Sequence, residues 1–316
     1  MLYLMISLRY SNFYTVVCVC KGSCLKYVLE VSTALVSCDK VSKQSKNTEN
    51  LSCQDRVILE EHERLSPHLL FEIIRKDGEE ELSRSSKSLI FSGLAAGLLI
   101  SFSFYFKAIL FMYLKDVPWA ELITGIGYTT GFLIVILGRM QLFTENTITT
   151  VIPFFHDCSK EKFWQVMKLW GVVFLSNLAG TFLAACFLSN SYFVTAPVAS
   201  SLHNIAIHVV QISPMENLIR GIPAGILIAA IVWMMPMSRG FSFFLVLCFT
   251  YFISIGGFAH VVVGSCEVAY EVLQGNAGWY DYFFRFLFPT GFGNILGGTF
   301  VFTLLVYAQV SDDISS

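Results

Sequence analysis

His260 is the residue of this sequence whose type and position best suit chemistry. It follows Gly256 and Gly257 inside a long apolar stretch, and ionisable residues within such stretches are usually functional. Imidazole titrates near neutral pH, so His260 can give a proton to a weak-acid anion and later recover one. The alternative is a structural histidine whose ring is satisfied by a backbone carbonyl.

Charged residues also stand beside two interruptions of the apolar pattern. Arg139 and Glu145 flank the first interruption, GRMQLFTEN, and Glu267 follows the second. We expect Arg139 and Glu145 to pair with each other and support a loop, and Glu267 to play a similar part. Lys107 either extends to a membrane interface or lends positive potential to an anion vestibule.

The composition indicates an integral membrane protein. Of the 316 residues, 55% are hydrophobic and 14% charged, against roughly 25% charged in soluble domains. The net charge of −2 gives no sign of a nucleic-acid partner. The chain has no H-E-x-x-H, G-x-S-x-G or P-loop motif, so we expect no enzyme activity and no cofactor. The expected partner is the lipid bilayer.

Six apolar stretches follow one another as whole, broken, whole, and then again whole, broken, whole. A span needs about 20 residues. Because each half crosses the membrane an odd number of times, the second half must be inverted relative to the first. The sequence therefore predicts an all-α membrane protein of six transmembrane helices, an inverted 3+3 repeat whose two broken helices meet near the midplane. The whole spans are 88–114, 163–188, 217–237 and 286–310, and the broken ones 123–155 and 240–273.

The N-terminal part differs in character from the spans. Residues 39–56 are polar and aperiodic, as in disordered segments. Farther on, Ser66 and Pro67 suit the start of an amphipathic helix, and Gly78 suits its end. The predicted divisions are a disordered extension (1–56), a cytoplasmic amphipathic helical segment (57–87), the six-span domain (88–310) and a short cytoplasmic tail (311–316).

Lysine and arginine in short loops set the expected orientation. With the N-terminus inside, the inner loops carry six of these residues near the spans and the outer loops carry three. Both termini are therefore expected in the cytoplasm, with the chain spanning an inner or plasma membrane several times. The inner set is Arg84, Lys87, Lys160, Lys162, Lys168 and Arg239, and the outer set is Lys115, Arg220 and Arg285.

Neither the cysteines nor the remaining histidines predict a metal site. The nine cysteines are odd in number and scattered, unlike a disulfide framework. Cys18, Cys20 and Cys24 lack the paired spacing of zinc ligands. His203 and His208 are expected on a solvated amphipathic face. We therefore expect no bound metal.

Four motifs, in this order and spacing, resemble those of the formate/nitrite transporter family over residues 66–310. They are GRMQLFTENT (138–147), SNLAG (176–180), GFAH (257–260) and PTGFGNILGG (289–298). Within the family, GRxQLFTENT, HVVVGSxE and IRKDGEEEL most resemble the YfdC-like branch.

The resemblance implies an aquaporin-like protomer in a homopentamer with one pore per subunit. Such pores pass small monovalent anions such as formate, nitrite or hydrosulfide, often with a proton. His260 matches the central histidine, and Thr144 the pore threonine, although threonines in such helices often bond back to their own backbone. The matching constriction residues are Phe143 and Ile228 on the inner side and Tyr128, Phe132 and Ile253 on the outer side.

Three departures from the family pattern lie near the expected pore centre. Ala259 replaces the acidic residue that usually precedes the histidine, and Gly225 and Gly264 stand where asparagines are common. These changes leave His260 with fewer polar neighbours. They keep open a second reading, a non-conducting scaffold or sensor that retains the transporter fold.

Overall fold

The computed structural model describes residues 7–10, 13–16 and 65–314, apart from 115 and 239. The chain divides into two units, 1–64 and 65–316. In the first unit, β1 (Ser7–Tyr10) and β2 (Phe13–Val16) form an antiparallel pair. The predicted disorder of residues 1–56 otherwise lies outside the described residues.

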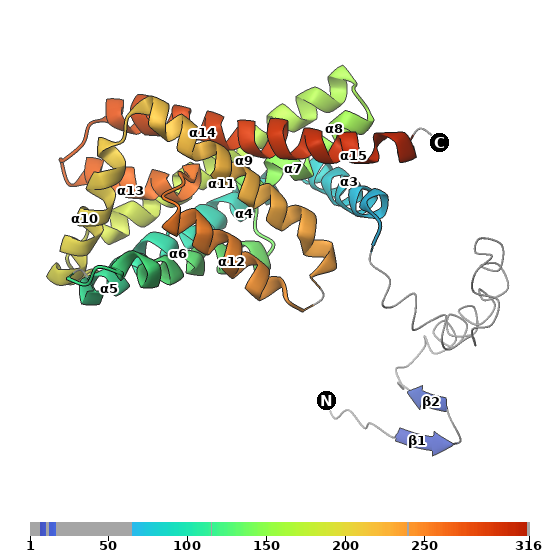
Figure 1. The fold of residues 1–316 in the computed structure, drawn as a ribbon, viewed down its shortest axis with the longest axis horizontal. Helices are drawn as coiled ribbons and strands as arrows, with labels where there is room; N and C mark the ends of the chain where they lie inside the picture. The colour runs from blue at the N-terminus through green and yellow to red at the C-terminus, as the bar shows by residue number, and fades with distance from the viewer. Residues whose placement is uncertain (1–6, 11–12, 17–64, 115, 239, 315–316) are drawn as a thin grey trace. The chain divides into compact units, whose positions relative to one another are not determined.

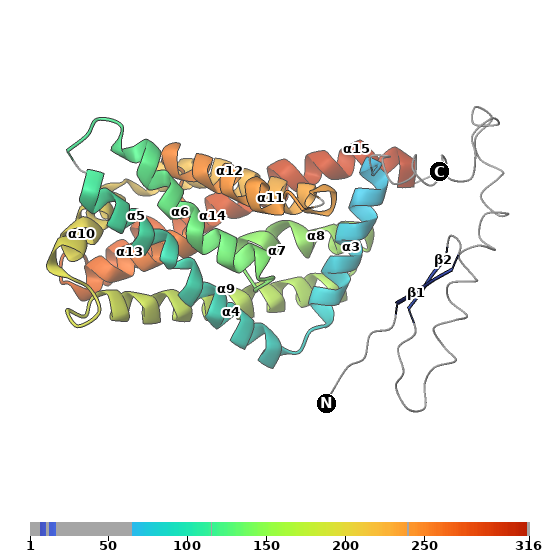
Figure 2. The same ribbon diagram turned by 90° about the horizontal axis from the view of Figure 1, so that it is seen from below.

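In the described part of the second unit, all regular secondary structure is helical (Figure 1). Figures 1 and 2 show α3 and α10 at opposite ends of the bundle that the other helices form. The elements are α3 (Pro67–Ser83), α4 (Ser86–Ile100), α5 (Phe102–Leu114), α6 (Ala120–Leu137), α7 (Phe143–Thr149), α8 (Val151–His156), α9 (Lys160–Leu188), α10 (Ala196–Gln211), α11 (Pro214–Met234), η2 (Met235–Met237), α12 (Ser242–Ile255), α13 (Val261–Leu273), η3 (Asp281–Leu287), α14 (Phe288–Ile295), η4 (Leu296–Thr303) and α15 (Leu304–Ile314).

Among the described residues, five helical stretches are long and apolar enough to cross a membrane. A further apolar helix, α12, has 14 residues and is shorter than a usual span. It is followed by α13 across the second interruption, so the count of six crossings stays a prediction. The five stretches are Ser86–Leu114, Ala120–Leu137, Lys160–Leu188, Pro214–Met237 and Asp281–Val310.

Both predicted interruptions are confirmed, and they have the same shape. Residues 138–142 separate α6 from α7, and residues 256–260 separate α12 from α13. In each interruption the second residue has a positive φ, 51° at Arg139 and 61° at Gly257. The chain thus leaves one half-helix through a left-handed residue and starts the next, twice.

The two halves also pack their whole spans in the same way. At Gly97 in α4, an added Cβ would lie 2.0 Å from the carbonyl oxygen of Asn177 in α9. At Gly225 in α11, it would lie 2.2 Å from the carbonyl oxygen of Asn294 in α14. Both glycines therefore allow backbones to touch, and the repeated contact bears out the predicted inverted repeat.

Helix α3 begins as predicted but does not end at Gly78. The Ser66 hydroxyl accepts a hydrogen bond from the Leu69 N–H, and Pro67 opens the helix. The helix continues to Ser83, with Gly78 buried inside it. A Cβ there would lie 2.0 Å from the carbonyl oxygen of Thr149. Gly78 therefore allows α3 to pack tightly on α7, and the predicted stop is wrong.

The first and last spans are less regular than predicted. The first is two helices, α4 and α5, that meet at Ser101, whose hydroxyl donates to the carbonyl of Gly97 at 2.9 Å. Such bonds to the preceding turn bend helices. The last span starts at Asp281 rather than 286 and contains two π-helical segments, η3 and η4. Irregular turns of this kind are common near functional sites.

Candidate functional site

Thr144 and His260 meet where the second halves of the two interrupted helices begin. Thr144 lies in the first turn of α7, and His260 is the N-cap of α13. The Thr144 hydroxyl oxygen and His260 Nε2 are 2.8 Å apart. Both residues are buried. The contact therefore joins the two inverted halves through a buried polar pair.

The hydrogen bonds of His260 suggest which nitrogen carries the proton of its neutral ring. The Val263 N–H donates to Nδ1 at 3.4 Å, which makes Nδ1 an acceptor. The proton then sits on Nε2 and is donated to Thr144 Oγ1. The structure thus gives this ring an N–H donor and a threonine as partners, in place of the backbone carbonyl that the structural alternative required.

The Thr144 hydroxyl keeps its own hydrogen free to donate. Among the described residues it has no hydrogen-bond partner besides His260. It is Thr147, one turn later, whose hydroxyl donates back to a carbonyl, that of Thr144. Thr144 can therefore accept from His260 and still donate to a bound molecule.

Asn177 holds the first interruption in place. Its Oδ1 accepts from the N–H of Phe143 at 2.9 Å. Its Nδ2 donates to the carbonyls of Gly93 and Gln141, each at 2.8 Å. One side chain thus satisfies two backbone groups that the interrupted helix leaves without partners, those of Phe143 and Gln141, and ties them to the Gly93 carbonyl of α4.

Asn294 does the same at the second interruption. Its Oδ1 accepts from the N–H of Val261 at 3.0 Å, and its Nδ2 donates to the carbonyls of Gly221 and Ala259 at 2.9 and 2.8 Å. The two asparagines are therefore counterparts in the inverted repeat. The sequence marks these two asparagines by similar motifs, SNLAG and GNILGG. It does not show that their side chains bind the backbone of the interruptions.

Of the predicted outer constriction residues, Phe132 contacts His260 and Tyr128 contacts Phe132. The rings of Phe132 and His260 pack edge to face, with their centroids 4.8 Å apart. Tyr128 packs on Phe132 at 5.4 Å. Ile253 is fully buried.

The two predicted inner constriction residues are buried as well. Ile228 is fully buried in α11. The ring of Phe143 packs against Phe174 and Trp170 of α9, with centroids 4.6 and 5.7 Å away. That Phe143 and Ile228 form a ring around a path stays a prediction.

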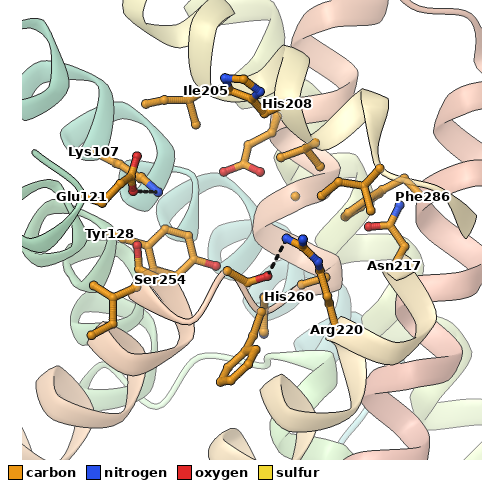
Figure 3. Close-up of a pocket in the computed structure, with 18 of the residues that line it drawn as sticks. Lys107, Glu121, Tyr128, Ile205, His208, Asn217, Arg220, Ser254, His260 and Phe286 are labelled. Atoms are coloured by element: carbon orange, nitrogen blue, oxygen red, sulfur yellow. Dashed lines mark hydrogen bonds and ion pairs between the residues drawn. The ribbon is translucent and has the colours of Figure 1, made fainter. Parts of the chain in front are cut away.

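A cavity of about 410 Å³ opens beside the second interruption (Figure 3). We call it the His260 cavity. Figure 3 shows Lys107, Glu121 and Tyr128 on one side of it and Arg220 and Asn217 on the other. Its polar lining also includes Glu267 and His208. The predicted vestibule residue Lys107 is therefore placed in a cavity next to His260.

A second cavity of about 410 Å³ opens beside the first interruption. We call it the Glu145 cavity. Its lining comes from α3, from the first interruption and from the end of α11, and it shares no lining residue with the His260 cavity. Because Leu142 and Glu145 line one cavity and His260 the other, the Thr144–His260 contact lies between them.

Arg139 and Glu145 do not pair as predicted. In the part of the chain that the structure describes, no ion pair or hydrogen bond joins them, and Arg139 is exposed. Glu145 Oε1 is buried without a hydrogen-bond partner. Arg139 instead contributes its left-handed backbone to the turn. The expected loop-supporting ion pair is therefore wrong, because the two side chains attract each other without direct contact.

Glu267 does not support the second interruption. It is 6% exposed, lines the His260 cavity and forms no hydrogen bond or ion pair with any described residue. Lys107 is bound elsewhere, since its Nζ lies 3.2 Å from a carboxylate oxygen of Glu121. The loop-supporting role predicted for Glu267 is therefore wrong, and its carboxyl group faces the cavity.

Close packing explains why Gly225 and Gly264 stand where asparagines are common in the family. At Gly264, an added Cβ would lie 2.2 Å from the ring of Phe286, and Gly225 meets the Asn294 carbonyl at the same distance. Neither position has room for an amide. Ala259 contributes its backbone, donating to the carbonyl of Arg220 and accepting from Asn294. The expected loss of polar neighbours around His260 is offset by Thr144.

His203, which was expected on a solvated helix face, contacts a buried carboxylate. Its Nδ1 lies 3.0 Å from a carboxylate oxygen of the fully buried Glu271, which also accepts from Asn276 at 2.9 Å. This cluster links α10 to the end of α13. In the described ranges, this cluster included, no group of three His, Cys, Asp or Glu side chains could hold a metal ion. The Cys18, Cys20 and Cys24 cluster lies outside the described residues.

Inverted halves with two interrupted helices, joined at a buried polar pair between two cavities, define a membrane channel or transporter. Comparison of the sequence with known families identifies the family of channels or transporters to which the chain belongs. The sequence profile of the formate/nitrite transporter family matches residues 68–308, and the chain belongs to that family. Its members are channels and transporters rather than enzymes.

Similar proteins agree with this assignment. The Escherichia coli K12 inner membrane protein YfdC is 38% identical over 247 residues, 78% of this chain and 80% of its own. The Haemophilus influenzae formate channel FocA is 24% identical, covering 66% of this chain and 81% of its own. A pentameric formate channel with formate bound has the same fold, with a TM-score of 0.62, 19% identity and coverage of 72% of this chain and 97% of its own.

Proposed function

We propose that this chain forms pores for small monovalent anions of weak acids, such as formate, nitrite or hydrosulfide, or for their conjugate acids. The observation that carries the proposal is the Thr144–His260 contact between two cavities. The FocA relatives are named formate channels, and the structural neighbour holds formate. Both support this class of permeant.

The chemistry follows from the cost of moving a bare ion through an apolar constriction. An unpaired charge in a low-dielectric surrounding costs far more than one contact returns. Neutralising the anion removes that cost. Protonation of the ring adds a proton at Nδ1 and breaks the contact with the Val263 N–H. The charged ring then gives its Nε2 proton to Thr144 Oγ1 while Thr144 passes its hydroxyl proton to the anion, which leaves a neutral acid and a neutral ring with its proton on Nδ1. Nε2 regains a proton from the cavity that His260 borders, and this restores the charged ring.

The apolar residues around the polar pair would exclude hydrated ions. Tyr128, Phe132 and Ile253 lie on the side of the His260 cavity in this proposal, and Phe143 and Ile228 on the other side. Their burial supports it. Such rings admit a small neutral molecule more easily than an ion with its water shell.

Assembly and orientation belong to the same proposal. The pentameric structural neighbour supports a homopentamer, each protomer having its own path. The excess of lysine and arginine on one set of loops supports placing both termini in the cytoplasm. The scaffold reading would require a path that is closed at Thr144 and His260.

Flux through proteoliposomes tests the proposal. Purified pentamers are reconstituted with a pH-sensitive dye inside and mixed with formate, nitrite or hydrosulfide. We expect the internal pH to change at least tenfold faster than in protein-free vesicles for at least one of the three. A correctly assembled protein that accelerates none of them would contradict the proposal and favour the non-conducting scaffold.

A further inference from the structure

Glu267 is the acidic side chain of the His260 cavity that has no partner. It lies two helical turns after His260 on α13, and Gly264 between them lines the same cavity, so these three residues share one face of the helix. Glu267 is 6% exposed. Its carboxyl oxygens form no hydrogen bond with described residues, yet neither oxygen is completely buried. The carboxyl group is therefore accessible from the cavity.

The two cationic side chains of the cavity are already paired. Lys107 lies 3.2 Å from Glu121, and Arg220 is paired with Glu216. The Arg220 guanidinium also donates to the carbonyl of Gly257 at 3.3 Å, the dashed contact in Figure 3. When each of these pairs is counted as neutral, the formal charge that remains in the cavity is that of Glu267, which Lys107 attracts without direct contact.

A lone carboxylate next to a narrow path treats two kinds of anion differently. An anion of a weak acid can share one proton with it, as two neighbouring carboxyl groups do, so the pair carries one negative charge instead of two. The proton enters from solution with the anion and leaves with it. An anion of a strong acid, such as nitrate, holds no proton and meets the full repulsion of the carboxylate.

We propose that Glu267 is a specificity-determining residue that lets weak acids through the His260 cavity and rejects anions that cannot be protonated. This inference rests on the proposed function and names the residue that selects among its permeants. The charged or titratable groups facing the same cavity are Lys107, Glu121, Tyr128, His208, Arg220 and His260. Glu267 differs from these acidic and basic side chains because it is buried and forms no ion pair or hydrogen bond with a described residue.

The experiment compares formate and nitrate uptake in proteoliposomes, with potassium and valinomycin present so that charge movement does not limit either flux. Glu267→Gln keeps the size of the side chain and removes its charge. We expect the formate-to-nitrate ratio to fall about 30-fold, mainly through faster nitrate uptake. Glu161→Gln, which removes an exposed carboxylate at the start of α9, is expected to leave the ratio unchanged.

A second measurement needs no variant. In the wild-type protein, nitrate uptake is expected to rise as the pH is lowered, because protonated Glu267 no longer repels the anion. A nitrate flux that does not change with pH, or a ratio that Glu267→Gln leaves within twofold of the wild type, would overturn the inference alone. Wild-type vesicles that carry no formate would overturn the proposed function as well.

Discussion

Replacing His260 with leucine is expected to lower formate flux about 100-fold, the largest loss of any single substitution that leaves the fold intact. Leucine fills a similar volume but cannot bond Thr144 or hold a proton. A charge-assisted hydrogen bond in a water-poor site is worth about 3 kcal/mol, which corresponds to that factor. Stopped-flow uptake into proteoliposomes measures it, and His156→Leu, at an exposed histidine at the end of α8, is expected to have no effect.

His260→Asn separates proton transfer from hydrogen bonding. Asparagine can cap α13 and donate to Thr144, but it cannot carry a proton. We expect its formate flux to lie between those of the wild type and His260→Leu and to lose the wild-type dependence on pH. If His260→Asn kept the full wild-type flux and pH profile, the relay would be ruled out and a fixed polar centre would remain.

The second large effect concerns folding. Asn294→Leu is expected to destabilise the protein by about 4 kcal/mol, because the Val261 N–H and the Ala259 carbonyl lose their partner at roughly 1–3 kcal/mol each. The Gly221 carbonyl, which lies inside α11, loses only a second bond. Asn177→Leu should cost about as much, since Asn177 makes the same three bonds in the other half. Thermal unfolding in detergent measures both losses.

The control for this pair is Asn204→Leu, at an exposed asparagine on α10 that should tolerate the change. Equal and large losses at Asn177 and Asn294 would support two equivalent joints. If one variant unfolded like the wild type, that asparagine would not hold its interruption, and the symmetry argued from the bonds would fail.

The two interruptions could be predicted from the sequence because their cause is local. Each interruption is marked by neighbouring residues, Gly138 with Arg139 in the first and Gly256 with Gly257 in the second, and such interruptions occur where the backbone is buried in protein or lines a cavity. The end of α3 could not be predicted in the same way. Gly78 has the composition of a helix stop, and only the close approach of Thr149 explains why a glycine lies inside the helix.

Side-chain partners were harder to predict than backbone breaks. Arg139 and Glu145 are near in sequence, yet in the described residues the Glu145 carboxyl is buried without a hydrogen-bond partner at Oε1 while Arg139 is exposed. Asn177 and Asn294 act on backbone groups far away in the chain, so no local pattern shows their bonds. The fold and the position of His260 followed from the sequence; the lone carboxyl group of Glu267 required the cavity.

A metal-block measurement tests most directly that permeation runs between Thr144 and His260. Thr144→Cys puts a thiol beside the imidazole, and Cd²⁺ binds such a sulfur and nitrogen pair tightly. We predict that micromolar Cd²⁺ blocks formate flux through Thr144→Cys, that a chelator restores it, and that the wild type and the double variant Thr144→Cys/His260→Ala are not blocked. A Thr144→Cys protein that conducts formate and is indifferent to Cd²⁺ would contradict the account.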